Sequence, residues 1–100
     1  MILNSEIRLK KGIVTGSLIE LQNSSLIVIN SSNGYLMCRY LNMDVANKFG
    51  DIAAIVTGVN NLEEALDAKI VELSDKAKKL GLKIGISGRQ FLNEILKENF

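Results

Sequence analysis

Cys38 is the most reactive side chain in this sequence, because it is the single cysteine among 100 residues and no histidine is present. Arg39 follows it, and a cation beside a thiol favours the nucleophilic thiolate. Neighbouring residues of a strand point to opposite faces, so the Arg39 guanidinium is expected across the sheet from the sulfur unless the strand ends or bulges there. The pattern favours a buried, inert thiol, and a catalytic Cys38 is the alternative.

A second candidate site is the segment Gly85-Ile86-Ser87-Gly88-Arg89. Glycines ahead of a helix start, with an arginine in the first turn, form an arrangement that receives phosphate or carboxylate groups. On this interpretation Gly85, Ser87, Gly88 and Arg89 bind a small anionic ligand. The alternative is structural, because Ser87 and Gln90 have the spacing of a capping box, which accounts for most of the segment.

The residue types that are missing exclude several classes of function. With no histidine and one cysteine, one subunit contains no Ser-His-Asp triad, no Cys-His pair, no disulfide and no ordinary zinc site. We therefore expect no metal and no cofactor. Twelve Lys and Arg against eleven Asp and Glu give a net charge of +1, which provides no overall field for nucleic acid or an anionic membrane.

The elements that must position Cys38 are strands, since β-branched and apolar residues dominate the first 40 positions, for example residues 13–21 and 26–29. Asn33-Gly34 predicts a two-residue hairpin turn, because both central positions of a type I′ turn require a positive φ. That register places Ile29 opposite Cys38. The expected core face comprises Ile27, Ile29, Leu36, Cys38 and Tyr40. The opposite face comprises Val28, Asn30, Tyr35, Met37 and Arg39.

The spacing becomes helical after residue 41. Asn42 is expected to cap a short helix that Gly50 ends in a left-handed conformation. Residues 52–57 predict a buried strand, and the intervening helix allows that strand to pair in parallel.

A helical period then runs from residue 61 to residue 80, with Asn60 or Asn61 as its cap and Glu63 or Glu64 as partner. Gly81 is expected to end it in a Schellman motif. A short extended piece, residues 83–86, precedes a last helix from Ser87 to about residue 97.

These elements predict one domain over residues 1–100, of the α/β class and α+β type. It would contain a small mixed, mainly antiparallel sheet with helices packed mostly on one face. Residues 26–29 and 52–56 are apolar on both faces, and so short a domain has few helices with which to cover both sides. We therefore expect a homodimer, or another homo-oligomer, that buries the face of Val28 and Met37.

The amino-terminal residues do not resemble a secretory signal, and the longest apolar run, residues 52–56, is far too short to span a bilayer. A single unpaired cysteine fits a reducing compartment. The expected location is the cytoplasm, without membrane association.

Several short motifs together resemble the YunC-like family, whose members are described as a domain of unknown function. The resemblance runs from about residue 12 to residue 96. The motifs are Gly34-Tyr35-Leu36-Met37-Cys38, Tyr40-Leu41, Val56-Thr57-Gly58-Val59, Leu66-Asp67-Ala68, Leu80-Gly81-Leu82 and Gly85-Ile86-Ser87-Gly88-Arg89. The resemblance implies one small α/β domain and brings no activity, substrate or cofactor.

The chain departs from the family pattern at Arg39, where a glycine is usual, and at Asn42, where an aspartate is usual. Similar proteins often carry a proline where this chain has Lys69, which implies a break near residues 67–69: a short helix, a turn, then a longer helix. Two classes of function remain open. One is an oligomeric interaction or scaffold module. The other is a small-anion or metabolite-binding protein, or a thiol-dependent enzyme, with a site near Cys38 and the helix start at Ser87, Gly88 and Arg89.

Overall fold

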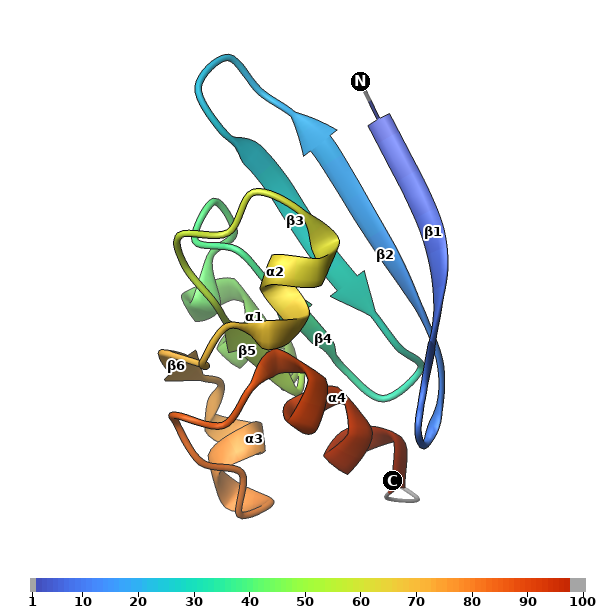
Figure 1. Cartoon of the computed structure of the whole chain (residues 1–100). Coiled ribbons are helices and arrows are strands. Elements are labelled where there is room, and N and C mark those ends of the chain that lie inside the picture. The colour runs from blue at the N-terminus through green and yellow to red at the C-terminus, as the bar shows by residue number, and fades with distance from the viewer. Residues whose placement is uncertain (1, 98–100) are drawn as a thin grey trace.

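The sheet has six strands whose spatial order is the same as their order in the chain (Figure 1). The computed structural model describes residues 2–97. The strands are β1 (Ile2–Leu9), β2 (Gly12–Glu20), β3 (Ser25–Asn30), β4 (Tyr35–Met37), β5 (Ala53–Ile55) and β6 (Glu72–Leu73). All neighbours pair antiparallel except β4 and β5, which are parallel. The expected mixed, mainly antiparallel sheet is confirmed.

Four helices accompany the sheet, namely α1 (Met43–Phe49), α2 (Leu62–Asp67), α3 (Asp75–Lys79) and α4 (Gly88–Lys97). Figure 1 shows α2 and α4 in front of the sheet and α1 behind it. We call the face under α2 and α4 the inner face and the face under α1 the outer face. The main core lies on the inner face, where Ile27, Ile29 and Leu36 pack against Phe91 and Leu92. The small α+β fold with helices mostly on one face is therefore confirmed.

The cap at the start of α1 and the glycines that end α1 and α3 lie where the sequence predicts them. The Asn42 side chain accepts a hydrogen bond from the Asp44 amide at 2.7 Å, and Gly50 has a φ of 71° at the end of α1. At the end of α3, the Leu82 amide donates to the Ala77 carbonyl at 3.3 Å, which is the Schellman bond. Gly81 supplies the positive φ that this motif requires.

The predicted register of the β3–β4 hairpin is wrong by two residues. Asn30 lies opposite Tyr35 and Ile29 opposite Leu36, so residues 31–34 form a four-residue connection. The Ser31 hydroxyl closes this loop by accepting a hydrogen bond from the Gly34 amide at 3.2 Å and donating one to the Gly34 carbonyl at 2.8 Å. Gly34 has no positive φ and is needed because a Cβ there would collide with the Ile52 carbonyl.

A shift of two residues leaves every side chain on its expected face. Ile27, Ile29, Leu36 and Cys38 are all buried in the main core, as predicted. Tyr40 is the exception, because β4 ends at Met37 and Tyr40 lies in the following turn with 56% of its surface exposed.

The helical period from residue 61 to residue 80 does not form one helix. It is broken after Asp67, as the family resemblance implies, but the intervening segment contains strand β6 rather than a simple turn. The Val71 amide donates to the Ile55 carbonyl and the Ser74 amide to the Ala53 carbonyl, both at 2.9 Å, so this segment satisfies the free edge of β5. The second helix, α3, is short rather than long for this reason.

Met37 is buried by its own chain and not by a partner. It packs on the outer face against Met43 and Ala46 of α1 and Ile55 of β5. Met37 therefore needs no partner subunit to cover it, which corrects this part of the expected oligomer face, while Val28 on the neighbouring strand is only half-buried. Homo-oligomerisation itself stays a prediction. Across residues 2–97, no helix is long and apolar enough to cross a membrane.

Candidate functional site

The candidate site lies at the carboxyl ends of β4 and β5, the two parallel strands. Cys38 follows β4 and Val56 follows β5, and the Val56 amide donates to the Met37 carbonyl at 3.0 Å, which holds the two strand ends together. In sheets with parallel strands, ligands commonly bind outside the carboxyl ends, where the connecting loops diverge. Here one connection leads into α1 and the other into α2.

Cys38 is a buried free thiol that still pairs with β3. Its amide donates to the Ile27 carbonyl at 3.0 Å, and its sulfur accepts a hydrogen bond from the Ile27 amide at 3.3 Å. Its neighbour across the sheet is thus Ile27 rather than Ile29. The burial expected for this thiol is confirmed, and its reactivity stays a prediction.

The alternation of side chains between the two faces of a strand does not extend to Arg39, because β4 ends before it. The Leu41 amide donates to the Cys38 carbonyl at 3.2 Å, so Arg39 and Tyr40 occupy the middle of a tight turn. The Arg39 guanidinium pairs with the Glu72 carboxylate at 3.2 Å, and both side chains are largely exposed. Exposed ion pairs of this kind contribute little free energy, so the guanidinium can change partner at low cost.

These residues border a pocket of about 440 Å³, which we call the Cys38 pocket. Its lining comprises Ser24, Ser25, Cys38, Arg39, Tyr40, Val56, Thr57, Gly58, Val59 and Asn60. The lining combines polar residues that carry hydroxyl or amide groups with the buried side chains of Val56 and Val59. Arg39 carries the only formal charge among these lining residues.

The polar lining of this pocket escaped the sequence analysis. Ser24 and Ser25 carried no functional signal in the sequence, Thr57 ended the predicted strand of residues 52–57, and Asn60 was one of two expected helix caps. The parallel pairing of residues 52–57 with the Cys38 strand was the one signal that could have located them. Among the described residues, no group of three or more His, Cys, Asp or Glu side chains is placed to hold a metal ion.

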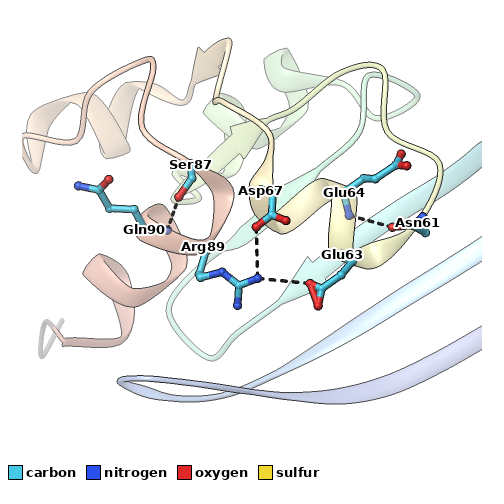
Figure 2. A network of polar contacts seen from close by, with 7 residues as sticks. All are labelled: Asn61, Glu63, Glu64, Asp67, Ser87, Arg89 and Gln90. Carbon is cyan, nitrogen blue, oxygen red and sulfur yellow. Dashed lines mark hydrogen bonds and ion pairs between the residues drawn. The ribbon is translucent and has the colours of Figure 1, made fainter.

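The second predicted site lies elsewhere, at the start of α4 (Figure 2). The Ser87 hydroxyl accepts a hydrogen bond from the Gln90 amide at 3.0 Å, as a helix cap does. The amides of Gly85 and Gly88 donate to the carbonyls of Ile70 and Ala68, each at 2.9 Å. These two amides are therefore engaged within the protein.

Gly88 and Arg89, which take no part in the capping box, have packing and charge partners. A Cβ on Gly88 would lie 2.5 Å from the Ala65 carbonyl oxygen, so the glycine permits close contact between α4 and α2. Figure 2 shows Arg89 reaching across to α2, where its guanidinium lies 3.3 Å from both Glu63 and Asp67.

The start of α2 is capped by a side chain named in the sequence analysis. Asn61 accepts a hydrogen bond from the Glu64 amide at 2.8 Å, and the Glu64 carboxylate accepts one from the Asn60 amide at 2.8 Å. The cap predicted at Asn60 or Asn61 is thus Asn61, with Glu64 as its partner. This capping arrangement fixes the loop that carries Asn60 into the Cys38 pocket.

The structure does not bring the two candidate sites together. None of residues 85–89 lines the Cys38 pocket. The anion site predicted at Gly85, Ser87, Gly88 and Arg89 thus shares no pocket with the thiol. The reason for joining them in one mechanism is lost.

Comparison with known proteins assigns this chain to a family. The chain belongs to DUF1805, described as a domain of unknown function, whose family model matches residues 37–95. That range includes Cys38 and the β5 side of the pocket. The resemblance to a YunC-like family is confirmed.

Two relatives illustrate the family. The chain is 29% identical over 87 residues to the uncharacterized protein YunC of Bacillus subtilis (strain 168), covering 83% of this chain and 86% of that protein. It is similar in fold to the crystal structure of TA1206, a protein of unknown function from Thermoplasma acidophilum. The TM-score is 0.89 at 38% identity, over 95% of this chain and 93% of that one.

Proposed function

We propose that this protein binds a small anionic metabolite, one bearing a carboxylate or a phosphate, in the Cys38 pocket. The observation that carries the proposal is the position of Arg39, the single charged side chain in the lining of a pocket otherwise built from neutral groups. A single guanidinium among neutral donors favours binding of an anion and disfavours binding of a cation. The volume of about 440 Å³ suits a small metabolite.

The neutral lining supports the same ligand class. The hydroxyls of Ser24, Ser25 and Thr57 supply donors that orient oxygen atoms of a ligand. Val56 and Val59 provide a buried apolar wall for its carbon atoms. A metabolite with one anionic end and a short carbon skeleton satisfies both sets of groups.

Arg39 would reach such a ligand by exchanging its partner. In the free protein the guanidinium pairs with Glu72 at 3.2 Å, outside the pocket lining. A ligand carboxylate or phosphate offers bidentate geometry in place of this exposed pair. Binding therefore replaces one ion pair with another and leaves the exposed Glu72 carboxylate to be solvated by water.

The test is a thermal-stability titration with inorganic phosphate and with acetate. At a ligand concentration ten times Kd, mass action stabilises a folded protein by about 1.4 kcal/mol, roughly 6 °C for a domain of this length. We expect such a rise for the unmodified protein and its loss in Arg39→Gln. Arg89→Gln is the matched control, since Arg89 lies outside the pocket, and it should keep the rise. Equal responses of the two variants would reject the proposal.

A thiol-dependent reaction is a second candidate, favoured by the position of Cys38 in the lining of the same pocket. Alkylation of the folded protein by iodoacetamide separates the two candidates. Alkylation of the folded protein that phosphate suppresses supports a reactive thiol at the ligand site. Alkylation only on unfolding rejects the reaction and leaves the binding function intact.

We propose that the protein is located in the cytoplasm, where a reducing environment keeps an unpaired thiol free.

A further inference from the structure

The outer face of the sheet is only partly covered by the described residues. Helix α1 packs over β4 and β5, through Met43 and Ala46. No described helix lies over the outer face of β1 to β3, where Ile13 is exposed and Ile19 and Val28 are half-buried. The outer face therefore has a step, with a helix on one side and bare strands on the other.

A trough of about 530 Å³ lies at this step, between α1 and β3. Its lining is mostly apolar and comprises Val28, Asn30, Tyr35, Met37, Tyr40, Leu41, Asn42, Val45 and Ala46. The helix residues in this lining belong to the first half of α1 and the turn before it. The trough is therefore beside the amino-terminal part of α1.

Phe49 ends the same helix and is the most exposed large hydrophobic residue of the described chain, at 73%. It follows Val45 by four residues, and residues four apart lie on one flank of a helix. Since Val45 lines the trough, Phe49 projects from the flank that faces the bare strands. The outer face thus carries both the apolar trough and a protruding apolar side chain, that of Phe49.

We propose that a second copy of this chain covers the outer face, with the two α1 helices packed antiparallel about a twofold axis. An isologous interface requires one surface to hold both halves of each contact. With the trough at the start of α1 and Phe49 at its end, an antiparallel pair places each Phe49 at the trough of the other copy. The bare strands β2 and β3 then lie under the partner's helix.

The charges of α1 are complementary in the same arrangement. Asp44 lies in the first turn and Lys48 in the last turn, and both are exposed. Antiparallel helices bring the Asp44 end of one copy beside the Lys48 end of the other. A parallel pair would instead juxtapose like charges, which is unfavourable at helix contacts.

Sedimentation equilibrium tests the proposal. The unmodified chain should be a dimer, and Phe49→Asp should weaken dimerisation by about 30-fold or more, the effect typical of a buried aromatic anchor. Ile84→Asp is the control, because Ile84 is also largely exposed, at 59%, but lies in the loop before α4. It should stay dimeric. A monomeric unmodified chain at high micromolar concentration would overturn the proposal, as would a dimeric Phe49→Asp variant with unchanged circular dichroism.

Disulfide trapping in a Cys38→Ser background tests the orientation of the helices. Antiparallel packing brings Val45 of one copy close to Phe49 of the other. A mixture of Val45→Cys and Phe49→Cys chains should therefore cross-link faster than either chain alone. Cross-linking of the mixture no faster than the separate chains would contradict the antiparallel pair.

Discussion

The guanidinium of Arg39 lies 3.2 Å from the carboxylate of Glu72, and this ion pair joins the turn after β4 to the edge strand β6. The side chains are 61% and 40% exposed, so the pair should stabilise the fold by less than about 1 kcal/mol. Glu72→Gln should therefore leave the free energy of unfolding nearly unchanged. It should also tighten phosphate binding, because it releases Arg39. Calorimetric titration measures this, and weaker binding than in the unmodified protein would argue against Arg39 as the ligand group.

Gly88 permits the contact between α4 and α2, so Gly88→Ala should destabilise the protein. The added methyl group would collide with the Ala65 carbonyl and with Leu36. The expected loss is about 1–3 kcal/mol, which outweighs the helix propensity gained, about 1 kcal/mol at most. Urea denaturation measures it. Gly12→Ala is the control, because the nearest atom to its Cβ is 3.5 Å away on Leu96, and it should change stability little.

Ser74 is fully buried and serves two elements at once. Its hydroxyl accepts hydrogen bonds from the Ala53 amide of β5 at 3.0 Å and from the Ala77 amide of α3 at 3.3 Å. Ser74→Ala leaves a buried amide without its partner and removes a helix cap, which should cost about 2–4 kcal/mol. Asn61→Ala removes only the exposed cap of α2 and should cost about 1 kcal/mol. Equal losses in denaturant titrations would contradict the second role of Ser74.

Tyr35 should titrate late and make stability depend on pH in the alkaline range. Burial, the 2.7 Å hydrogen bond to Asp51 and the charge of that carboxylate raise its pKa from 10.0 to about 12. The unfolded chain loses this proton first as pH rises. The stabilisation is therefore complete below about pH 10 and is lost between about pH 10 and 12.

Tyrosinate absorbance of a Tyr40→Phe variant, in which Tyr35 is the single tyrosine, measures this pKa directly. Denaturant titrations at several pH values complete the test. Tyr35→Phe should show a flatter alkaline decline in stability than Tyr40→Phe. Parallel declines in the two variants would show that the Tyr35–Asp51 contact does not shift the titration.

The sequence predicted features that depend on residues a few positions apart. Asn42, Asn61 and Gly81 cap helices as expected, because each needs only the backbone of the adjoining helical turn. The hairpin register failed because Ser31 closes a longer loop with its own hydroxyl, an option that the Asn33-Gly34 signal concealed.

Features that depend on pairing across the sheet could not be predicted from residues a few positions apart. Ile70 and Leu73 have a spacing that fits a helix, yet they are buried within an extended segment that pairs with β5 through Glu72 and Leu73. Ser24 and Asn60 lie on one pocket although 36 positions separate them in the chain. Only the strand order brings such residues together. Cys38 was found because its residue type is rare, and no spacing pointed to its neighbours.

The order of the strands, identical to their order in the chain, also bears on how the protein acquires its structure during synthesis. Each strand pairs with the one made just before it, so no strand must wait for a distant segment to emerge from the ribosome. The meander of β1, β2 and β3 needs only short loop closures, whereas the connections from β4 to β5 and from β5 to β6 each enclose a helix. Assembly of the sheet would then follow translation from one edge to the other.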